Sequence, residues 1–346
     1  MKTNKILFSV LAAAGILFTA CSNDEPVQLP KDAQAISFRT QGGTPEGIQR
    51  TPGTTLPYVD AFVVYGTDNK FGNALIFDGI TVARDIKTGF FTYAPTRYYD
   101  LEATSAAFVA FSPASAKIGP AAPITTFWTT GANFNYTVPV PNATGNATQE
   151  DLLVANTVVG TIDPDDPKVP FKFEHALARV FVSATNSTAD PVIINGLTLV
   201  NLEATGTLKF DATATYAWEW DLAGSLKPYA YVLAETGIAV EPTLPNATPK
   251  LVTSMEQGMM ILPQVTKNDN DDDELDTDDF ALEVIYSLGN LKNKTKNILL
   301  PDGFEFEAGN QYKINIEFTG IGIYFTIEVA DFVDADPEFV NWEPLP

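Results

Sequence analysis

The stretch Phe171-Lys172-Phe173-Glu174-His175-Ala176-Leu177-Ala178-Arg179-Val180-Phe181-Val182 is the most distinctive part of this chain. Apolar and polar residues alternate at both of its ends, as they do in half-buried β-strands. The middle of the stretch, Glu174–Ala178, is suited to one helical turn or to a bulged turn. The segment therefore predicts two strands joined by an irregular turn.

The composition of the whole chain extends this prediction to an all-β fold. The chain has 346 residues, of which 45% are hydrophobic and 18% charged, with 23 Gly and 24 Pro. Such a mixture favours many short strands and turns over long helices. The length allows two domains. The acidic, proline-rich segment Gly160–Pro170 is the expected hinge, which predicts domains at residues 51–167 and 168–346.

Charge and cysteine content narrow the function classes. The formal net charge is −22, which argues against nucleic acid as a partner and against adsorption to anionic lipid surfaces. Cys21 is the only cysteine, so no intrachain disulfide can form. Stability must therefore come from apolar burial.

The first residues have the pattern of a lipoprotein signal peptide. Lys2 and Lys5 precede an apolar run, Ile6–Ala20, that is too short to span a bilayer comfortably. Small residues then precede Cys21, which predicts a signal peptide at residues 1–20 and a lipidated Cys21 at the start of the mature chain. The alternative is an ordinary signal peptide followed by an incidental cysteine.

Residues 21–50 are predicted to form a lipidated leader that contains one short strand. Within Ala33–Thr40, Ile36 and Phe38 share one face, while Ser37 and Arg39 share the other. A segment rich in Gly and Pro follows and contains Arg50. An arginine in such a loop is accessible to proteases.

Four segments together resemble the fimbrillin family, the type V pilus subunits and their lipoprotein relatives. The segments, in chain order, are Asp151-Leu152-Leu153-Val154-Ala155, Phe171–Val180, Met259–Gln264 with its Leu-Pro-Gln ending, and Gly309–Ile316. The lipidation motif, the early strand and Arg50 also follow the order of the family. The resemblance therefore spans the whole chain.

The resemblance implies two tandem transthyretin-like β-sandwich domains and assembly by strand exchange. An arginine-specific protease would remove the leader with its strand, and a strand from the next pilus subunit would fill the vacated groove. Arg50 matches the processing site, Arg39 is an alternative, and Ile36 and Phe38 belong to the displaced strand. The chain would be lipid-anchored and exposed at the outer membrane, and part of a fimbrium after processing.

The C-terminal tail has two interpretations. It could be a donor strand that fills a neighbouring subunit's groove, or it could pack across a final core strand at Ile321–Val329. The candidate anchors of a donor tail are Phe332, Phe339, Val340 and Trp342. A stalk subunit and an accessory or tip subunit both remain open.

A second hypothesis is a monomeric surface lipoprotein that binds glycans. Tyr216, Trp218 and Trp220 have the spacing of one strand face and could stack on sugars, or they could belong to the core. A host protein or glycan receptor is conceivable under either hypothesis.

Two charged segments stand out in the C-terminal half. The acidic run Asp269–Asp279 departs from the EF-hand pattern, because Glu274 and Phe280 stand where Gly and Glu are required. It is therefore interpreted as a solvated hairpin loop, with weak cation binding as the alternative. Lys292, Lys294 and Lys296 form a basic patch that is expected to be a turn.

The sequence gives no support for catalysis. His175 is the only histidine, which removes multi-histidine metal sites and weakens any Ser-His-Asp proposal. We expect His175 to be a core residue. The chain contains no G-x-S-x-G motif, P-loop or dinucleotide-binding glycine motif, so no enzyme activity, metal or cofactor is expected.

Overall fold

The fold is known from a computed structural model. The structure describes residues 34–40, 59–70, 74–124, 131–139, 149–159, 161–163, 165–210, 217–224, 226–231, 233, 236–243, 248–253, 258–268, 279–331 and 343–344. All regular elements within these ranges are strands, which confirms the predicted all-β class. Over the same ranges, no helix offers the length and apolarity that crossing a membrane requires.

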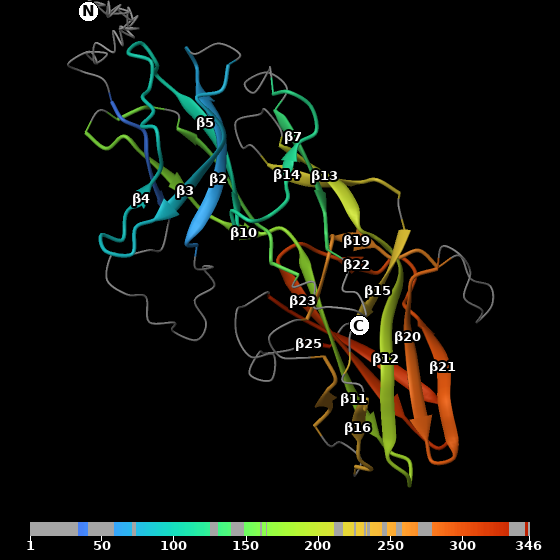
Figure 1. The fold of residues 1–346 in the computed structure, drawn as a ribbon. Coiled ribbons are helices and arrows are strands. Elements are labelled where there is room, and N and C mark those ends of the chain that lie inside the picture. Colours follow the sequence, from blue (N-terminus) through green and yellow to red (C-terminus); the bar gives the residue numbers. More distant parts are fainter. Residues whose placement is uncertain are drawn as a thin grey trace, which may run out of the picture.

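The sheet nearest the N-terminus is six-stranded, in the order β10-β8-β5-β2-β3-β4 (Figure 1). Its strands are β2 (Ala61–Asp68), β3 (Phe77–Arg84), β4 (Phe91–Thr92), β5 (Ala106–Ser112), β8 (Leu153–Val159) and β10 (Glu174–His175). Every residue of β5 is buried. This explains why Ala106–Phe111 is a continuous apolar run rather than an alternating one, since both faces of the strand are covered.

The two faces of this sheet belong to two hydrophobic clusters. Phe62 and Phe108 pack in a smaller cluster that also contains residues of β1 (Ser37–Thr40) and β9 (Lys168–Phe171). Val109 and Phe111, on the other face, pack in a larger cluster that continues to the C-terminal strands. The sheet is therefore the middle layer of the N-terminal half.

The layer on the second face is a four-stranded sheet in the order β14-β13-β7-β6. Its strands are β6 (Gly119–Pro120), β7 (Ala132–Thr137), β13 (Thr205–Phe210) and β14 (Trp218–Leu222). Strand β13 pairs with β7, and β10 pairs with β8, so strands on the two sides of the predicted boundary at 167/168 are hydrogen-bonded to each other. The division into two domains remains a prediction.

Two larger sheets make up the C-terminal half and enclose the rest of the larger cluster. The first has the order β17-β11-β23-β24-β25, with β18 pairing β11, and the second has the order β15-β12-β20-β21, with β16 pairing β12. The rings of Tyr286 in β20 and Phe318 in β23 meet across the two sheets, with centroids 5.2 Å apart. A two-stranded sheet, β19-β22, lies beside them.

The strands of the first sheet are β11 (Ala178–Asn186), β17 (Lys250–Leu251), β18 (Met259–Ile261), β23 (Asn310–Phe318), β24 (Ile323–Asp331) and β25 (Glu343–Pro344). The strands of the second are β12 (Val192–Glu203), β15 (Leu226–Tyr231), β16 (Ile238–Val240), β20 (Ala281–Leu288) and β21 (Leu291–Leu299), and the small sheet contains β19 (Gln264–Val265) and β22 (Glu305–Phe306).

Three expectations need correction. The basic segment around Lys294 is not a turn but the strand β21, because it pairs with the apolar strand β20 over most of its length. Ile321 does not belong to the last core strand; it lies in the turn between β23 and β24 and is 89% exposed. The predicted hinge Gly160–Pro170 ends inside a strand, because Lys168–Pro170 forms part of β9.

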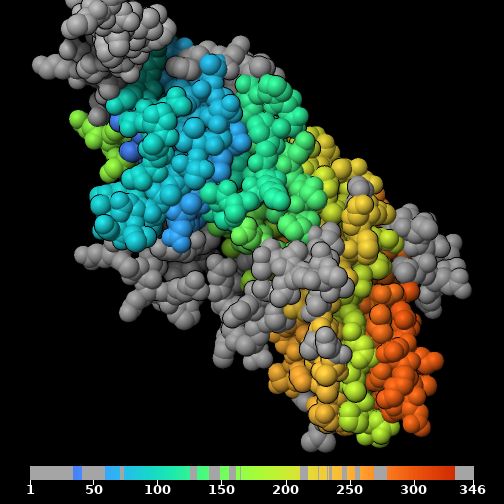
Figure 2. All heavy atoms as spheres, in the orientation of Figure 1, coloured from blue at the N-terminus to red at the C-terminus, as the bar shows by residue number. Residues whose placement is uncertain are grey.

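The molecule is elongated. In Figures 1 and 2 the N-terminal sheets lie at the upper left and the C-terminal sheets at the lower right. Strand β1 lies among the N-terminal sheets, and from the side drawn in Figure 2 only a few of its dark-blue atoms reach the surface.

Candidate functional site: the groove around the N-terminal strand

Residues 34–40, which end in strand β1, form backbone hydrogen bonds with two separate segments. Ser37–Thr40 runs parallel to β9, with Ser37 opposite Lys168 and Thr40 opposite Phe171. Just before β1, the Ile36 N–H donates to the Arg97 carbonyl at 2.9 Å, and the Tyr99 N–H donates to the Gln34 carbonyl at 3.2 Å. Residues 34–40 therefore fill a slot between β9 and the 97–99 segment.

The apolar face of this segment is buried in the slot. Ile36 is 2% exposed and Phe38 is 5% exposed. The Phe38 ring stacks on Phe171, with centroids 5.5 Å apart and an interplanar angle of 10°. It also contacts four further rings edge-on, those of Phe62, Phe77, Tyr93 and Phe108. Phe38 is thus the centre of an aromatic pocket.

Side chains of the middle sheet form the floor of the pocket, because alternate residues of a strand point to the same face. Phe62 and Val64 on β2, and Phe108 and Ala110 on β5, point to the same side of the middle sheet. Gly66 faces Phe108 across the two strands, and a Cβ added to it would come within 2.2 Å of the Phe108 ring. A glycine is needed there because the ring that contacts Phe38 occupies the space of a side chain.

Tyr93 closes the pocket with a hydrogen bond to the backbone of the strand. Its hydroxyl donates to the Ile36 carbonyl at 2.5 Å. Burial raises the pKa of the Tyr93 phenol, against a smaller opposing effect of the hydrogen bond with Arg97. The hydroxyl therefore stays protonated, and able to donate, throughout the physiological pH range.

Arg39 lies on the exposed face of β1. Its guanidinium forms an ion pair with Asp166 at 2.8 Å, and the two side chains are 52% and 40% exposed. Its backbone is opposite Pro170 in the parallel ladder. The alternative processing site is therefore part of a paired strand.

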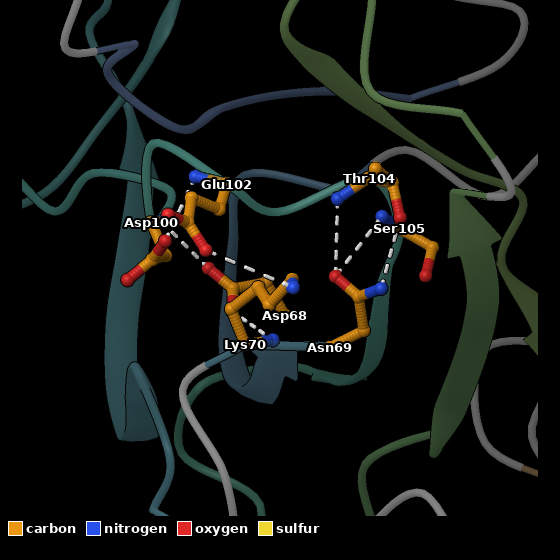
Figure 3. A network of polar contacts seen from close by, with 7 residues as sticks. All are labelled: Asp68, Asn69, Lys70, Asp100, Glu102, Thr104 and Ser105. Atoms are coloured by element: carbon orange, nitrogen blue, oxygen red, sulfur yellow. Dashed lines mark hydrogen bonds and ion pairs between the residues drawn. The ribbon is translucent and has the colours of Figure 1, made fainter.

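A polar network fixes the loops beside the slot (Figure 3). The buried Asp68 carboxylate accepts hydrogen bonds from the Lys70 N–H at 2.9 Å and the Asp100 N–H at 2.8 Å. Asn69 binds Thr104 through both its amide nitrogen and its amide oxygen. Because Asp100 follows the segment that pairs with residues 34–36, this network positions one wall of the slot.

Tyr93 and Asp68 were not predicted from the sequence as site residues. A tyrosine or an aspartate in a β-protein is common, and only the fold brings these residues to the slot. Phe171, by contrast, stands in the stretch that predicted the fold.

Several predicted site residues lie outside the described residues. They are the lipidation residue Cys21, the processing residue Arg50, the tail anchors Phe332, Phe339, Val340 and Trp342, and Tyr216 of the aromatic triplet. The acidic run is also outside them, apart from Asp279. Their assignments stay predictions.

Two other predicted positions are packed into the protein. The His175 side chain is 9% exposed, and its Nδ1 lies 2.5 Å from an Asp151 carboxylate oxygen. The Trp220 indole N–H donates to the Ala176 carbonyl at 2.8 Å, and its ring packs near Tyr136. Within the described ranges, no cluster of three or more His, Cys, Asp or Glu residues could hold a metal ion.

Solved structures with a similar fold come from fimbrial and cell-adhesion proteins. A fimbrial protein from Bacteroides vulgatus superposes with a TM-score of 0.53 and 14% identity, covering 78% of this chain and 92% of its own. A putative cell adhesion protein from Bacteroides uniformis is 19% identical, with a TM-score of 0.47 and coverage of 87% and 99%. The tip fimbrial protein Mfa3 from Porphyromonas gingivalis is 12% identical, with a TM-score of 0.40 and coverage of 79% and 94%.

The sequence itself carries the assignment to a family. No curated protein matches the chain. The model of the fimbrillin-like family matches residues 50–331, which is most of the chain and begins at the predicted processing arginine. The chain belongs to the fimbrillin-like family.

Proposed function

We propose that this protein is a cell-surface subunit of a fimbria and that β1 keeps its assembly groove closed until a protease acts. The observation that carries the proposal is the burial of Ile36 and Phe38 between β9 and the aromatic floor. Burial of each of these side chains contributes about 1.5–3 kcal/mol. Family membership supplies the biological setting.

Removal of residues 34–40 would leave a site suited to another strand. The backbone of β9 and of the 97–99 segment would lose its hydrogen-bond partners, and the pocket of Phe38 would be open to water. An extended chain that enters the slot satisfies the backbone groups and buries apolar side chains at once. Strand exchange is therefore a favourable reaction for the vacated groove.

Arg50 is the better candidate for processing than Arg39. A protease binds its substrate as an extended segment with free backbone groups, whereas Arg39 is paired with β9 and bound to Asp166. Cleavage after Arg50 would separate β1 from the body in the chain, while its contacts would still hold it in place. We propose that the incoming strand displaces it.

The remaining parts of the proposal rest on the sequence. Cys21 would carry lipid that anchors the uncut chain to the outer membrane, exposed at the cell surface. The partners would be other fimbrial subunits and an arginine-specific protease. The tail with Phe332, Phe339, Val340 and Trp342 would be the donor, and domains at 51–167 and 168–346 would be the two sandwiches of the subunit.

The donor role of the tail requires a rearrangement. Its described end, β25, pairs with β24 through Glu343 and Pro344. A proline is tolerated there because β25 is an edge strand. Among the described residues, β25 pairs with Glu328 and Val329 of β24, and this pairing would be lost when the tail leaves.

No observation favours the glycan-binding alternative. Trp220 uses its indole N–H for a bond to the Ala176 carbonyl, and Trp218 packs against the larger hydrophobic cluster. These contacts support a core role for both residues. The proposed role is structural and adhesive, without catalysis.

Limited proteolysis of the uncut chain tests the proposal. We expect an arginine-specific protease to cut after Arg50 first, and oligomers to form as the fragment that contains β1 leaves. At about 300 mM salt, where charge-driven contacts are screened, the R50A variant should stay uncut and monomeric, while R39A should behave like the wild type. A body that stays monomeric after a confirmed cut and loss of the fragment would contradict strand exchange.

A further inference from the structure

Among the described strands, β21 is an edge of the C-terminal half. It pairs with β20 on one side and ends the order β15-β12-β20-β21, so none of the described strands pairs with its other side. Residues 291–296 of β21 are all exposed. Free N–H and C=O groups at such an edge can pair with another extended chain.

Three of these exposed residues are lysines without an ion pair in the described part of the chain. Lys292, Lys294 and Lys296 occur within one strand of a protein whose net charge is −22. Other lysines are paired with carboxylates, including Lys209 with Asp221 at 2.6 Å and Lys313 with Glu328 at 2.6 Å. The cationic character of β21 is therefore not neutralised by the described residues.

The register of the hairpin places two of the lysines on the core-facing side of the sheet. Lys296 lies opposite the buried Val284, and Lys294 lies opposite Tyr286, which packs on Phe318. Directly opposed residues share a face of the sheet. Inward-pointing charges on an edge strand prevent pairing with apolar strands. The same charges make the edge selective for a strand that carries carboxylates.

We propose that β21 docks the acidic run Asp269–Asp279 of a second copy of this chain, which adds to the edge as an extended segment. The run contains Asp269, Asp271 and Asp273, so carboxylates recur at the two-residue period of the lysines. The free backbone edge favours a peptide over a polysaccharide, because only a peptide can continue the ladder. The contact is independent of the proposed strand exchange, since it uses the uncut chain and a different strand.

The position of the run within one chain favours a second copy. Its ends are joined, because the Phe280 N–H donates to the Lys267 carbonyl at 3.1 Å. The run enters β20 at Ala281, opposite Leu299, whereas the lysines lie toward the Gly289–Asn290 turn at the other end of the hairpin. Along β20, Val284 opposite Lys296 is three residues from Ala281, about 10 Å, and Tyr286 opposite Lys294 is five residues from it, about 17 Å.

Sedimentation of the full chain at increasing concentration tests the contact. Two copies with a charge of −22 repel each other, so nonspecific association strengthens when salt screens them. We expect the opposite: association at about 20 mM salt that weakens at least about tenfold at about 300 mM. Association that is absent at low salt, or that increases with salt, would overturn the proposal.

Charge-reversal variants locate the contact. K294E/K296E should weaken association at least about tenfold at low salt. K87E/K227E carries the same charge change at exposed lysines elsewhere, with Lys227 on the opposite edge of the same sheet, and should lose much less. Equal effects of the two variants would show that only net charge matters, and would refute the assignment to β21.

A synthetic peptide of residues 268–280 separates the remaining outcomes. It should bind the wild type and compete with self-association, and a version with N-methylated backbone nitrogens should bind at least about tenfold more weakly. Equal binding of both peptides would contradict strand addition. If the peptide fails while a sulfated polysaccharide binds in a manner sensitive to K294E/K296E, β21 is a polyanion site and the proposal is wrong. A chain that stays monomeric at every concentration at low salt would show that the run does not dock on a second copy, and would overturn the proposal.

Discussion

The two ends of this molecule differ in whether an edge strand is covered by another strand. At the N-terminal end, β9 is covered by β1, whose apolar residues Ile36 and Phe38 are buried in an aromatic pocket. At the C-terminal end, β21 pairs with one strand alone among those that the structure describes, and it carries exposed lysines. An apolar groove needs a strand to keep it from water, whereas a charged edge remains soluble by itself. The β9 edge is therefore suited to being covered at all times, by β1 or by a strand that replaces it. The β21 edge is suited to reversible contacts.

The largest effect is expected from charges placed in the aromatic pocket. I36D/F38D should lower the unfolding free energy of the uncut chain by at least about 4 kcal/mol. The substitutions remove the buried contacts of the Ile36 side chain and the Phe38 ring, and they place two carboxylates where water cannot reach them. Chemical denaturation measures the unfolding free energy of the variant and of the wild type, both for the uncut chain and for the cut body without β1. The cut body should show no change, because both residues have left.

S37D, on the other face of β1, is the matched control and should lower stability by less than about 1 kcal/mol. Equal losses for I36D/F38D and S37D would mean that the pocket does not distinguish the two faces of the strand.

A clash in the floor of the pocket should have the next largest effect. G66V places a side chain where the Phe108 ring lies and should destabilise the chain by about 1–3 kcal/mol. The loss should appear in both the uncut and the cut form, because Gly66 and Phe108 belong to the body. G119A, at a position with nothing within 4 Å, should be nearly neutral in the same denaturation experiment.

The hydrogen bond from Tyr93 should contribute a smaller amount. Y93F removes the donor to the Ile36 carbonyl and should lower the stability of the uncut chain by about 1 kcal/mol. Because the folded-state pKa of Tyr93 is raised above its ordinary value of 10.0, this contribution is fully present below that value and is lost as pH rises through the folded-state pKa. Melting curves of wild type and Y93F should therefore differ at neutral pH and converge in alkali.

The smallest effect on stability is expected at the charged edge. K294E/K296E should change the unfolding free energy by less than about 0.5 kcal/mol, since neither lysine has an ion pair among the described residues. Thermal unfolding of the isolated monomer checks this. A loss comparable to that of I36D/F38D would show that β21 has a structural role and would remove the contrast between the two edges.

The sequence predicted where many strands lie and which of their faces are apolar, but not which strands pair with each other. Alternation identified Ile36 and Phe38 as one face of a strand, and both side chains are buried in the structure. It misjudged the segment around Lys294, because exposed polar residues are typical of turns and only pairing with β20 makes them a strand. It placed Ile321 in the last strand because alternation continued into the turn.

The candidate site was predicted only in part for the same reason. Local patterns can identify which residues of β1 face a core, but they contain no information on the partner. Phe171 and Tyr93 are 133 and 55 positions from Phe38, and nothing local links them to it.

The amino-acid sequence was enough to predict that this chain is built of short strands, that its early strand has one apolar face, and that its charge disfavours nucleic acid as a partner. These properties follow from residue type, spacing and sum of charge. The three-dimensional fold was required to show that the early strand runs parallel to β9, that five aromatic rings surround Phe38, and that the lysines lie on an edge among the described strands. Pairing between distant strands depends on long-range packing, which is set by the whole core and not by any one segment.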